Sequence, residues 1–112
     1  MKRYCLALDL IDDTDLIAEY ESHHQKVWPE IIESIKDSGI TQLQIYRTAN
    51  RLCMIMEVNE SFSFVEKNKA DSSNPKVKEW ESMLWRYQQA LRLSKPGEKW
   101  SLMDKIFDLN KH

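Results

Sequence analysis

The sequence predicts a mixed α+β fold of the ferredoxin-like type, with the element order β-α-β-β-α-β. Apolar and polar side chains alternate within residues 40–48, and residues 52–58 form a short, mostly apolar run directly after a turn; both patterns are typical of strands. Apolar side chains recur at three- and four-residue steps over residues 14–37 and 75–91, which is typical of helices packed on a core. With a strand-like run at each end of the chain, this order predicts a four-stranded antiparallel sheet with helices on one face.

Residues 2–10 form the first predicted strand, and the polar residues 12–14 that follow are good N-caps. The helix behind them is expected to run to about Asp37, with Gly39 as the left-handed residue after its end. Pro29 lies inside this pattern. Because proline lacks an N–H and its ring clashes with the preceding turn, we expect the helix to kink or restart there.

The two central strands are joined by residues 48–51, a turn so short that the strands must form an antiparallel hairpin. Asn50 is the turn residue that best tolerates a positive φ. In the first of these strands, Leu43 and Ile45 face one way and Tyr46 the other.

The second half of the chain is predicted to contain a short helix capped by Ser61, a loop at residues 70–75, and a longer helix. That longer helix has Pro75 in its first turn and continues to Leu91. Residues 100–109 are predicted to form the last strand.

Length and composition favour one domain over residues 1–112, since 30% charged residues is ordinary for a globular protein. The net charge of −2 and the lack of a long apolar run give no support for nucleic acid or membrane binding. No secretory signal follows the first residues, so we expect a cytoplasmic protein. Cys5 and Cys53 are far apart, and adjacent His23 and His24 diverge by about 100° on a helix, so we expect no metal site.

Apolar side chains occur on both faces of the strand at residues 52–58, where Cys53 and Ile55 oppose Leu52, Met54 and Met56. A chain this short has no third layer to cover the second face. We therefore expect a homodimer in which the sheets of two copies pack together.

The stretch from Tyr20 to Glu30 concentrates the chemistry of the chain. One helical stripe carries Leu16, Tyr20, His24, Val27, Ile31 and Ile35. A hydroxyl and an imidazole thus occupy positions where a helix usually places leucine, with the Trp28 ring one turn further on. A histidine on an apolar face is most often a hydrogen-bonded core residue. The residues alone therefore predict a polar pocket under a helix and name no reaction.

Several stretches resemble the L-rhamnose mutarotase family, and they occur in the family's order over nearly the whole chain. They are Tyr20-x-x-x-His24, Val27-Trp28-Pro29-Glu30, Gly39-Ile40, Ile45-Tyr46, Asn50-Arg51-Leu52, Met56-Glu57-Val58 and Trp80-x-x-x-Leu84. The resemblance implies a cofactor-free enzyme that interconverts the α and β anomers of an L-6-deoxyhexose. It implies a dimeric ferredoxin-like α+β barrel, with His24 as the proton donor and Tyr20 as a sugar contact.

Two positions depart from the family pattern. Leu43 stands where the family has a sugar-contacting tyrosine, and Trp80-Glu81 stands where it has two tryptophans. Loss of a hydroxyl and gain of a carboxylate change which sugar hydroxyls find a partner. The substrate expected from the resemblance is therefore L-rhamnose or L-fucose.

The chemistry fits these residues, because mutarotation needs one proton delivered to the ring oxygen and another removed from the anomeric hydroxyl. An imidazole titrates near neutral pH, so His24 is the expected acid, and Tyr20 orients the sugar or relays a proton. The base is left open between Glu30 and Glu81, although a solvated helix face is the commoner role of both.

The remaining expected substrate contacts each have a structural alternative. Flat rings at Trp28 and Trp80 suit the apolar face of a sugar, but Trp80 also fits a plain core anchor. Tyr46 lines the site or covers the dimer contact. The same fold is used by cofactor-poor monooxygenases, by haem-degrading enzymes and by non-catalytic sugar-binding modules, which are the alternatives to a mutarotase.

Overall fold

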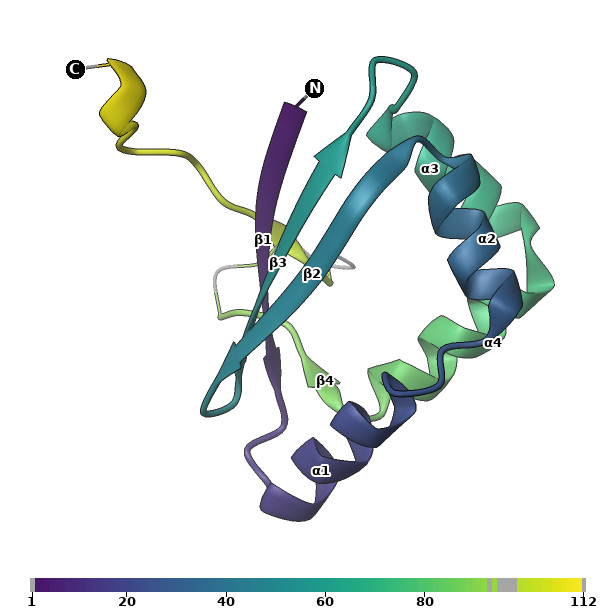
Figure 1. The fold of residues 1–112 in the computed structure, drawn as a ribbon. Coiled ribbons are helices and arrows are strands. Elements are labelled where there is room, and N and C mark those ends of the chain that lie inside the picture. The colour runs from purple at the N-terminus through teal and green to yellow at the C-terminus, as the bar shows by residue number, and fades with distance from the viewer. Residues whose placement is uncertain (1, 93, 95–98, 112) are drawn as a thin grey trace.

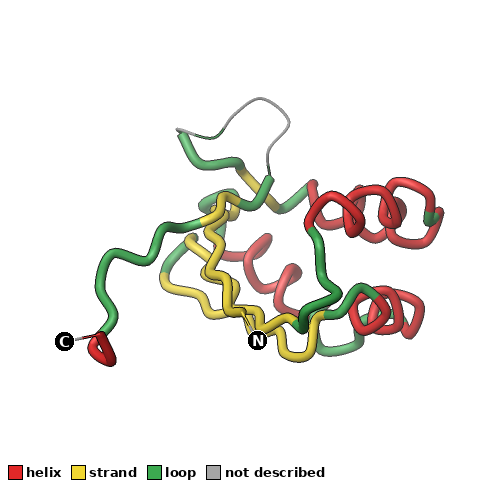
Figure 2. The backbone as a smooth tube through the Cα atoms, turned by 90° about the horizontal axis from the view of Figure 1, so that it is seen from above, coloured by secondary structure: helices red, strands yellow, loops and turns green. Residues whose placement is uncertain are grey.

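The computed structural model describes residues 2–92, 94 and 99–111. One antiparallel sheet forms one layer, and the helices lie against one of its faces (Figure 1). Seen from above, the C-terminal segment extends away from the sheet on the side opposite the helices (Figure 2). None of the helices in the described ranges combines the length and the apolar character that crossing a membrane requires.

The sheet has the strand order expected for a ferredoxin-like fold. Its long strands are β1 (Lys2–Leu10), β2 (Ile40–Thr48) and β3 (Arg51–Val58). The order is β2-β3-β1-β4, where β4 comprises only Gln88–Gln89, and a second short strand, β5 (Ser101–Leu102), also pairs with β1. The α+β, ferredoxin-like fold class predicted from the sequence is confirmed, as is the antiparallel β2–β3 hairpin.

The face of the sheet that lies under the helices carries the core. Alternate residues of β1 and β3 point into it, and four of them, Leu8, Leu10, Leu52 and Val58, are almost fully buried. Against one part of this face pack Tyr20 of the first helix and Val77, Trp80 and Leu84 of the last. Burying apolar area at about 25 cal/mol per Å² is the main force that holds this layer to the sheet.

The long first helix expected from the sequence is two helices in the structure. α1 (Thr14–His23) ends before the break at residues 24–28, and α2 (Pro29–Asp37) then begins. The stripe continues across the break, since Val27 and Trp28 still pack on the same core as Tyr20. The expectation of a restart at Pro29 is confirmed, whereas a continuous helix to Asp37 is wrong.

Pro29 occupies the first turn of α2 and not the interior of a helix. Trp28, the N-cap, has φ −59° and ψ 139°, the extended backbone that a residue before proline prefers. The ring therefore does not clash with a helical Gln25 carbonyl, because the chain at Gln25 has already left the helix. Proline is well suited to this position, where its missing N–H has no helical partner to lose.

Two turns place residues in the left-handed region. Gly39 follows α2 with φ 97°, as expected, and a Cβ there would approach Asn59 Oδ1 to 2.6 Å. In the β2–β3 turn the positive φ, 50°, belongs to Ala49 and not to Asn50. Asn50 instead donates its side-chain N–H to the carbonyl of Leu10 at 3.0 Å, which ties the turn to β1.

The helices of the second half begin and end at other residues than the pattern predicts. α3 (Phe64–Ser73) is capped by Ser63, whose hydroxyl accepts from Glu66 N, so the predicted Ser61 cap is wrong. α3 also extends through most of the predicted loop at 70–75. The predicted start of α4 (Pro75–Trp85) at Pro75 is confirmed, with Asn74 as its N-cap, but the helix ends well before Leu91.

The predicted last strand at residues 100–109 is largely absent from the described chain. Only β5 is paired, through Leu6–Leu102 and Ala7–Ser101, and Leu109–Lys111 form a 3-10 turn. The alternating apolar residues of this segment lie mostly in solvent, and Ile106 is 96% exposed. The alternation of apolar residues indicated an extended chain here. A strand also needs a neighbouring strand edge to pair with, and no strand pairing in the described chain includes residues after Leu102.

Replacing Pro29 with alanine is expected to lower the free energy of unfolding by about 0.4–1 kcal/mol, because the unfolded chain regains freedom that the ring removes. Urea unfolding followed by circular dichroism measures this change. Glu33→Ala, at an exposed position of the same helix, is the control and should change little. A more stable Pro29→Ala variant would show that the ring interrupts a helix after all.

Candidate active site

The end of α1 builds the candidate site. Asp13 caps the start of this helix by accepting the Leu16 N–H at 3.0 Å, and regular turns then carry Tyr20 and His24 to one side. His24 is the C-cap, so its backbone N–H closes the last turn on Glu21 at 3.1 Å. The Tyr20 and His24 ring centroids lie 4.5 Å apart and 41° from parallel.

The hydrogen bonding of His24 determines its tautomer. Its Nδ1 lies 2.9 Å from the backbone carbonyl oxygen of Tyr20. A carbonyl can only accept, so Nδ1 carries the hydrogen and the lone pair of the neutral ring is on Nε2. Within the described part of the chain, Nε2 has no hydrogen-bond partner, and the side chain is only half-buried. This nitrogen is therefore available to exchange a proton with a bound molecule.

Two tryptophans extend the ring cluster beyond the imidazole. Trp80 of α4 meets His24 edge-on at 5.8 Å and Trp28 edge-on at 5.1 Å. Trp80 is only 6% exposed, whereas Trp28 is half-buried. The structure thus brings together four predicted site residues, Tyr20, His24, Trp28 and Trp80, in one row of contacting rings.

The Tyr20 phenol is buried, with 3% of the residue exposed. Its oxygen accepts a hydrogen bond from Gln88 Nε2 at 3.4 Å. Burial raises the pKa of Tyr20 above its ordinary value near 10, and the Gln88 hydrogen bond opposes this in part. The phenol therefore stays protonated at neutral pH, which makes it a hydrogen-bonding group and not a base.

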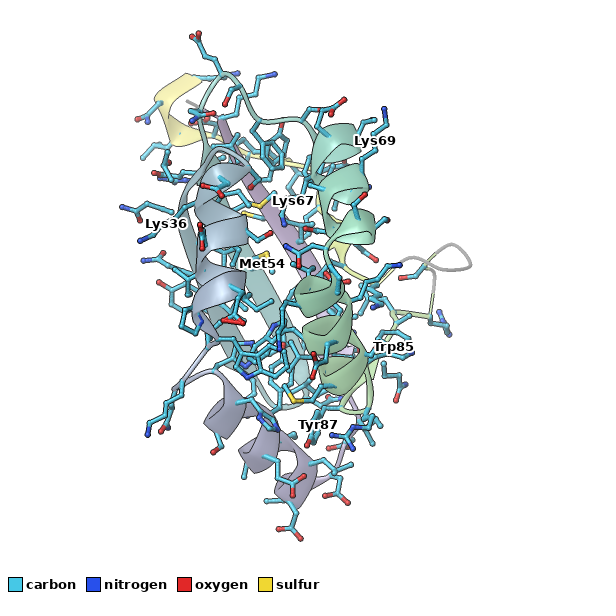
Figure 3. The ribbon with its side chains drawn as sticks, turned by 90° about the vertical axis from the view of Figure 1, so that its right-hand side faces the viewer. Lys36, Met54, Lys67, Lys69, Trp85 and Tyr87 are labelled. Atoms are coloured by element: carbon cyan, nitrogen blue, oxygen red, sulfur yellow. The ribbon has the colours of Figure 1, made fainter. Side chains whose placement is uncertain are left out.

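Sequence reasoning missed two residues that hold this end of α1. Tyr87 and Gln88 follow α4 directly, and Tyr87 lies where α4 meets α1 (Figure 3). The Tyr87 hydroxyl is 3.3 Å from His23 Nε2, next to the Gln88–Tyr20 bond. The stripe of residues 75–91 did predict that Tyr87 would be buried, but no sequence pattern indicated that Gln88 would be.

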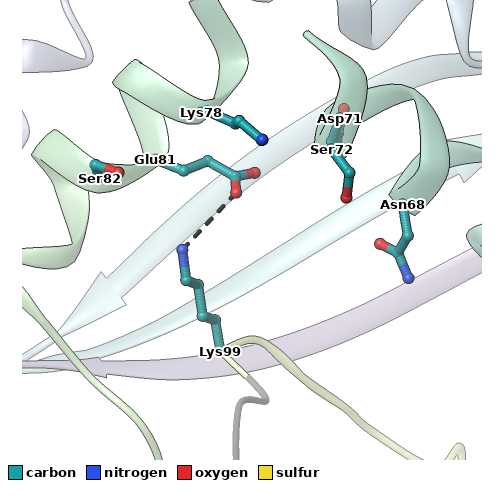
Figure 4. A pocket seen from close by; sticks show the side chains of 7 residues that line it. All are labelled: Asn68, Asp71, Ser72, Lys78, Glu81, Ser82 and Lys99. Atoms are coloured by element: carbon teal, nitrogen blue, oxygen red, sulfur yellow. Dashed lines mark ion pairs between the residues drawn. The ribbon is translucent and has the colours of Figure 1, made fainter. Parts of the chain in front are cut away.

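Glu81 lies apart from the ring cluster. It lines a polar pocket of about 600 Å³ between α3 and α4, shown in Figure 4, and forms an ion pair with Lys99 at 3.7 Å. The other lining residues are Asn68, Asp71, Ser72, Lys78 and Ser82. Glu30 is exposed in the first turn of α2. Among the described residues, neither carboxylate hydrogen-bonds to His24, so no partner base is positioned beside it.

The two β2 residues expected near the sugar are also separated from the rings. Leu43 faces the helices but packs with the second apolar cluster, around Leu6 and Met56. Tyr46 points to the opposite face of the sheet and is 57% exposed. In the described ranges, no group of three or more metal-binding side chains is arranged to hold an ion.

Fold and site together define a ferredoxin-like α+β protein whose half-buried histidine is held in one tautomer among aromatic rings. Residues 3–109 match the family described as L-rhamnose mutarotase. A protein from Xanthomonas campestris pv. campestris named L-fucose mutarotase is 44% identical over 112 residues, which cover 98% of this chain and 90% of that protein. The chain therefore belongs to the L-rhamnose mutarotase family.

Two solved structures share the fold. An L-rhamnose mutarotase from Formosa agariphila has a TM-score of 0.71 and 18% identity, covering 97% of this chain and 99% of the other. Tetracenomycin F2 cyclase from Streptomyces glaucescens, a type-II polyketide cyclase, has a TM-score of 0.65 and 14% identity, covering 96% of each chain. Because the second carries different chemistry on this fold, activity must be argued from the site.

Tyr20→Phe should weaken the dependence of stability on alkaline pH. The folded state holds the phenol proton more tightly than the unfolded state, because burial raises the pKa. That contribution is complete below the ordinary pKa of about 10 and is lost as pH rises through the folded-state pKa.

Urea unfolding at neutral pH and at several pH values above the ordinary phenol pKa tests this. The parent should lose more stability with rising pH than Tyr20→Phe does, and exposed Tyr46→Phe should behave as the parent. Parallel curves for the parent and Tyr20→Phe would show that Tyr20 is not buried in solution.

Proposed function

We propose that this protein interconverts the α and β anomers of an L-6-deoxyhexose, and that L-fucose is its preferred sugar. The observation that carries the proposal is His24 Nε2, which has no hydrogen-bond partner among the described residues and is held in one tautomer between the rings of Tyr20 and Trp80, with Trp28 packed on Trp80. Family membership over residues 3–109 supports the reaction class. The 44% identical relative named L-fucose mutarotase supports the sugar.

His24 is proposed to act at the ring oxygen of the sugar. In its imidazolium form, Nε2 delivers a proton to this oxygen as the bond to the anomeric carbon breaks, and that bond's electron pair stays on the oxygen. The anomeric hydroxyl releases its proton to water, and its O–H electron pair forms the aldehyde C=O bond. After the aldehyde turns, closure in the reverse sense returns the proton to Nε2. Because an imidazole nitrogen can both give and accept a proton, the same group serves both directions.

The aromatic rings suit the rest of such a substrate. A 6-deoxyhexose presents a methyl group and apolar C–H faces beside its hydroxyls, and these pack well on flat rings. Trp28 is the ring with exposed surface, while Trp80 is almost wholly covered. We therefore propose Trp28 as the direct stacking partner and Trp80 as the support that holds Trp28 and His24 in place.

Leu43 and Glu81 are proposed to influence the choice of sugar. L-Fucose and L-rhamnose differ in configuration at C2 and C4, so their hydroxyls project differently from the same ring and methyl. A site that pairs hydroxyls discriminates strongly against one that is misplaced. Leucine in place of a phenol and carboxylate in place of an indole alter that pairing. Because Glu81 lies across α4 from the rings, its influence would act through the polar pocket.

The function is tested by NMR measurement of anomer exchange, using saturation transfer between the two anomeric protons of each sugar. The purified protein should accelerate exchange of L-fucose, and more than that of L-rhamnose at equal concentration. His24→Ala should lose about 10²–10⁴-fold of the rate, the usual contribution of a general acid–base group.

The matched control is Gln25→Ala, at the exposed position next to His24, which should exchange L-fucose at the parent rate. If His24→Ala kept the parent rate, His24 would have only a structural role in the core. A parent that accelerates neither sugar would reject the proposed function itself.

We further propose that the enzyme is a homodimer formed through the sheet face opposite the helices. The centre of this face is apolar, with Cys5 and Ala7 of β1 beside Cys53 and Ile55 of β3. Salt bridges border it at both ends, from Arg3 to Glu57 and from Arg51 to Asp9 at 2.8 Å. A polar border around an apolar centre is the usual anatomy of a protein interface.

The C-terminal segment supports the same proposal. After β5 it runs away from the sheet on the side that bears no helix (Figures 1 and 2). Its apolar side chains Leu102, Met103, Ile106 and Leu109 are each at least half exposed. Exposed apolar residues in a row are a typical sign of a surface that another chain covers. A second copy supplies such a surface with two-fold symmetry.

Sedimentation velocity at micromolar concentration should therefore give twice the chain mass of 13.3 kDa. Ile106→Asp should weaken this dimer, because it places a charge at the proposed contact. Val65→Asp is the control, since Val65 is also exposed, at 62%, but lies on α3 in the helical layer. A parent that stays monomeric at high concentration would reject the dimer.

The compartment proposed is the cytoplasm. Cys5 and Cys53 are both free thiols in the structure, which fits a reducing environment.

A further inference from the structure

Gln88 is held in place by the backbone of β1. Its strand β4 pairs Gln88 with Leu10 and Gln89 with Asp9, and the Tyr87 carbonyl accepts the N–H of Ile11 at 2.8 Å. These bonds attach the chain after α4 to the end of β1, directly beside α1. The position of the Gln88 side chain is therefore set by the sheet, not by a loop.

A buried amide at this position is costly unless it is hydrogen-bonded. Gln88 is 8% exposed, and it is the one polar residue among the buried residues of the described chain. Its Nε2 donates to the hydroxyl oxygen of Tyr20, also buried, at 3.4 Å. A residue that only filled space here would more simply be leucine or methionine. The amide instead lies where its nitrogen meets the hydroxyl of Tyr20, an expected sugar contact.

The direction of this hydrogen bond determines what the phenol can do. Amide nitrogen only donates, so the Tyr20 oxygen accepts and its own O–H hydrogen points away from Gln88. The His24 ring packs on the same phenol ring, at 4.5 Å between centroids, and among the described residues no acceptor takes the Tyr20 hydrogen. The Tyr20 hydrogen is thereby left for a ligand beside His24.

We propose that Gln88 is a positioning residue for the reaction, which makes Tyr20 a hydrogen-bond donor to the sugar by occupying the acceptor side of its hydroxyl. The end of α1 then presents two groups to the sugar. Tyr20 Oη donates a hydrogen bond, and His24 Nε2 exchanges the proton. The inference rests on the proposed function, because it assigns a role within the same reaction.

The first test is a double-mutant cycle. Gln88→Leu should lower kcat for L-fucose exchange about 10-fold, the effect of one hydrogen bond in the transition state. In a Tyr20→Phe background the same substitution should change kcat by less than about 2-fold, since the group it acts through is gone. Gln89→Leu, at the exposed neighbouring position of β4, should keep the parent rate.

A second test reads the direction of the bond without using activity. With 3,5-difluorotyrosine in place of tyrosine, phenol ionisation moves to a lower, accessible pH and is followed by fluorine NMR, with Tyr20 assigned from the Tyr20→Phe spectrum. A donor to the oxygen stabilises the ionised phenol, so Gln88→Leu should raise the pKa of residue 20. If Tyr20 were the donor to Gln88, the same variant would lower it.

The outcomes separate this inference from the function on which it rests. A parent without anomer exchange rejects the proposed function. An active parent with Gln88→Leu at the parent rate, or with equal losses in the parent and Tyr20→Phe backgrounds, rejects the role of Gln88 alone. A lowered or unchanged pKa in the fluorine titration rejects the assigned direction of the hydrogen bond. Circular dichroism of each variant confirms that the fold is retained.

Discussion

The pairing of β1 is the interaction on which the rest of the structure depends. One edge of this strand is fully used by β3, over eight residue pairs from Lys2–Val58 to Asp9–Arg51. The other edge is divided between two short strands, with β4 near Leu10 and β5 near Leu6. The first contact brings Gln88 beside Tyr20, and the second sets where the C-terminal segment leaves the sheet. β1 therefore positions both the candidate site and the proposed dimer surface.

The parts of the fold that sequence analysis predicted are those with a strong local pattern. β1 and β3 are short apolar runs next to turn residues, β2 alternates around Leu43 and Ile45, and Pro75 marks the start of α4, so their positions were found almost to the residue. The full extent of the break at residues 24–28 was not found, because Val27 and Trp28 continue the apolar stripe although the backbone there is not helical. The strand predicted over residues 100–109 shows the same limit, since alternation cannot supply a partner edge.

The residues of the candidate site were likewise predicted correctly where a local pattern or side-chain type indicated them. Tyr20 and His24 are four residues apart on one helix, so their contact followed from helical geometry alone. Trp28 and Trp80 were expected beside them for their flat rings, and they are in contact. Glu81 and Leu43 were expected from positions in a related family and Tyr46 from the alternation of its strand, and the structure places each away from the rings. Gln88 depends on a two-residue pairing with β1, which has no sequence signature.

The contact between His24 and the carbonyl of Tyr20 has one more consequence. The acceptor is part of the main chain, so no substitution at position 20 can remove it. Which of the two ring nitrogens carries the hydrogen is thus determined by the way α1 ends. Substitutions among the surrounding side chains do not change it. Evolution can exchange the aromatic neighbours to suit a new sugar while the same nitrogen keeps its lone pair, provided that the last turn of the helix stays wound.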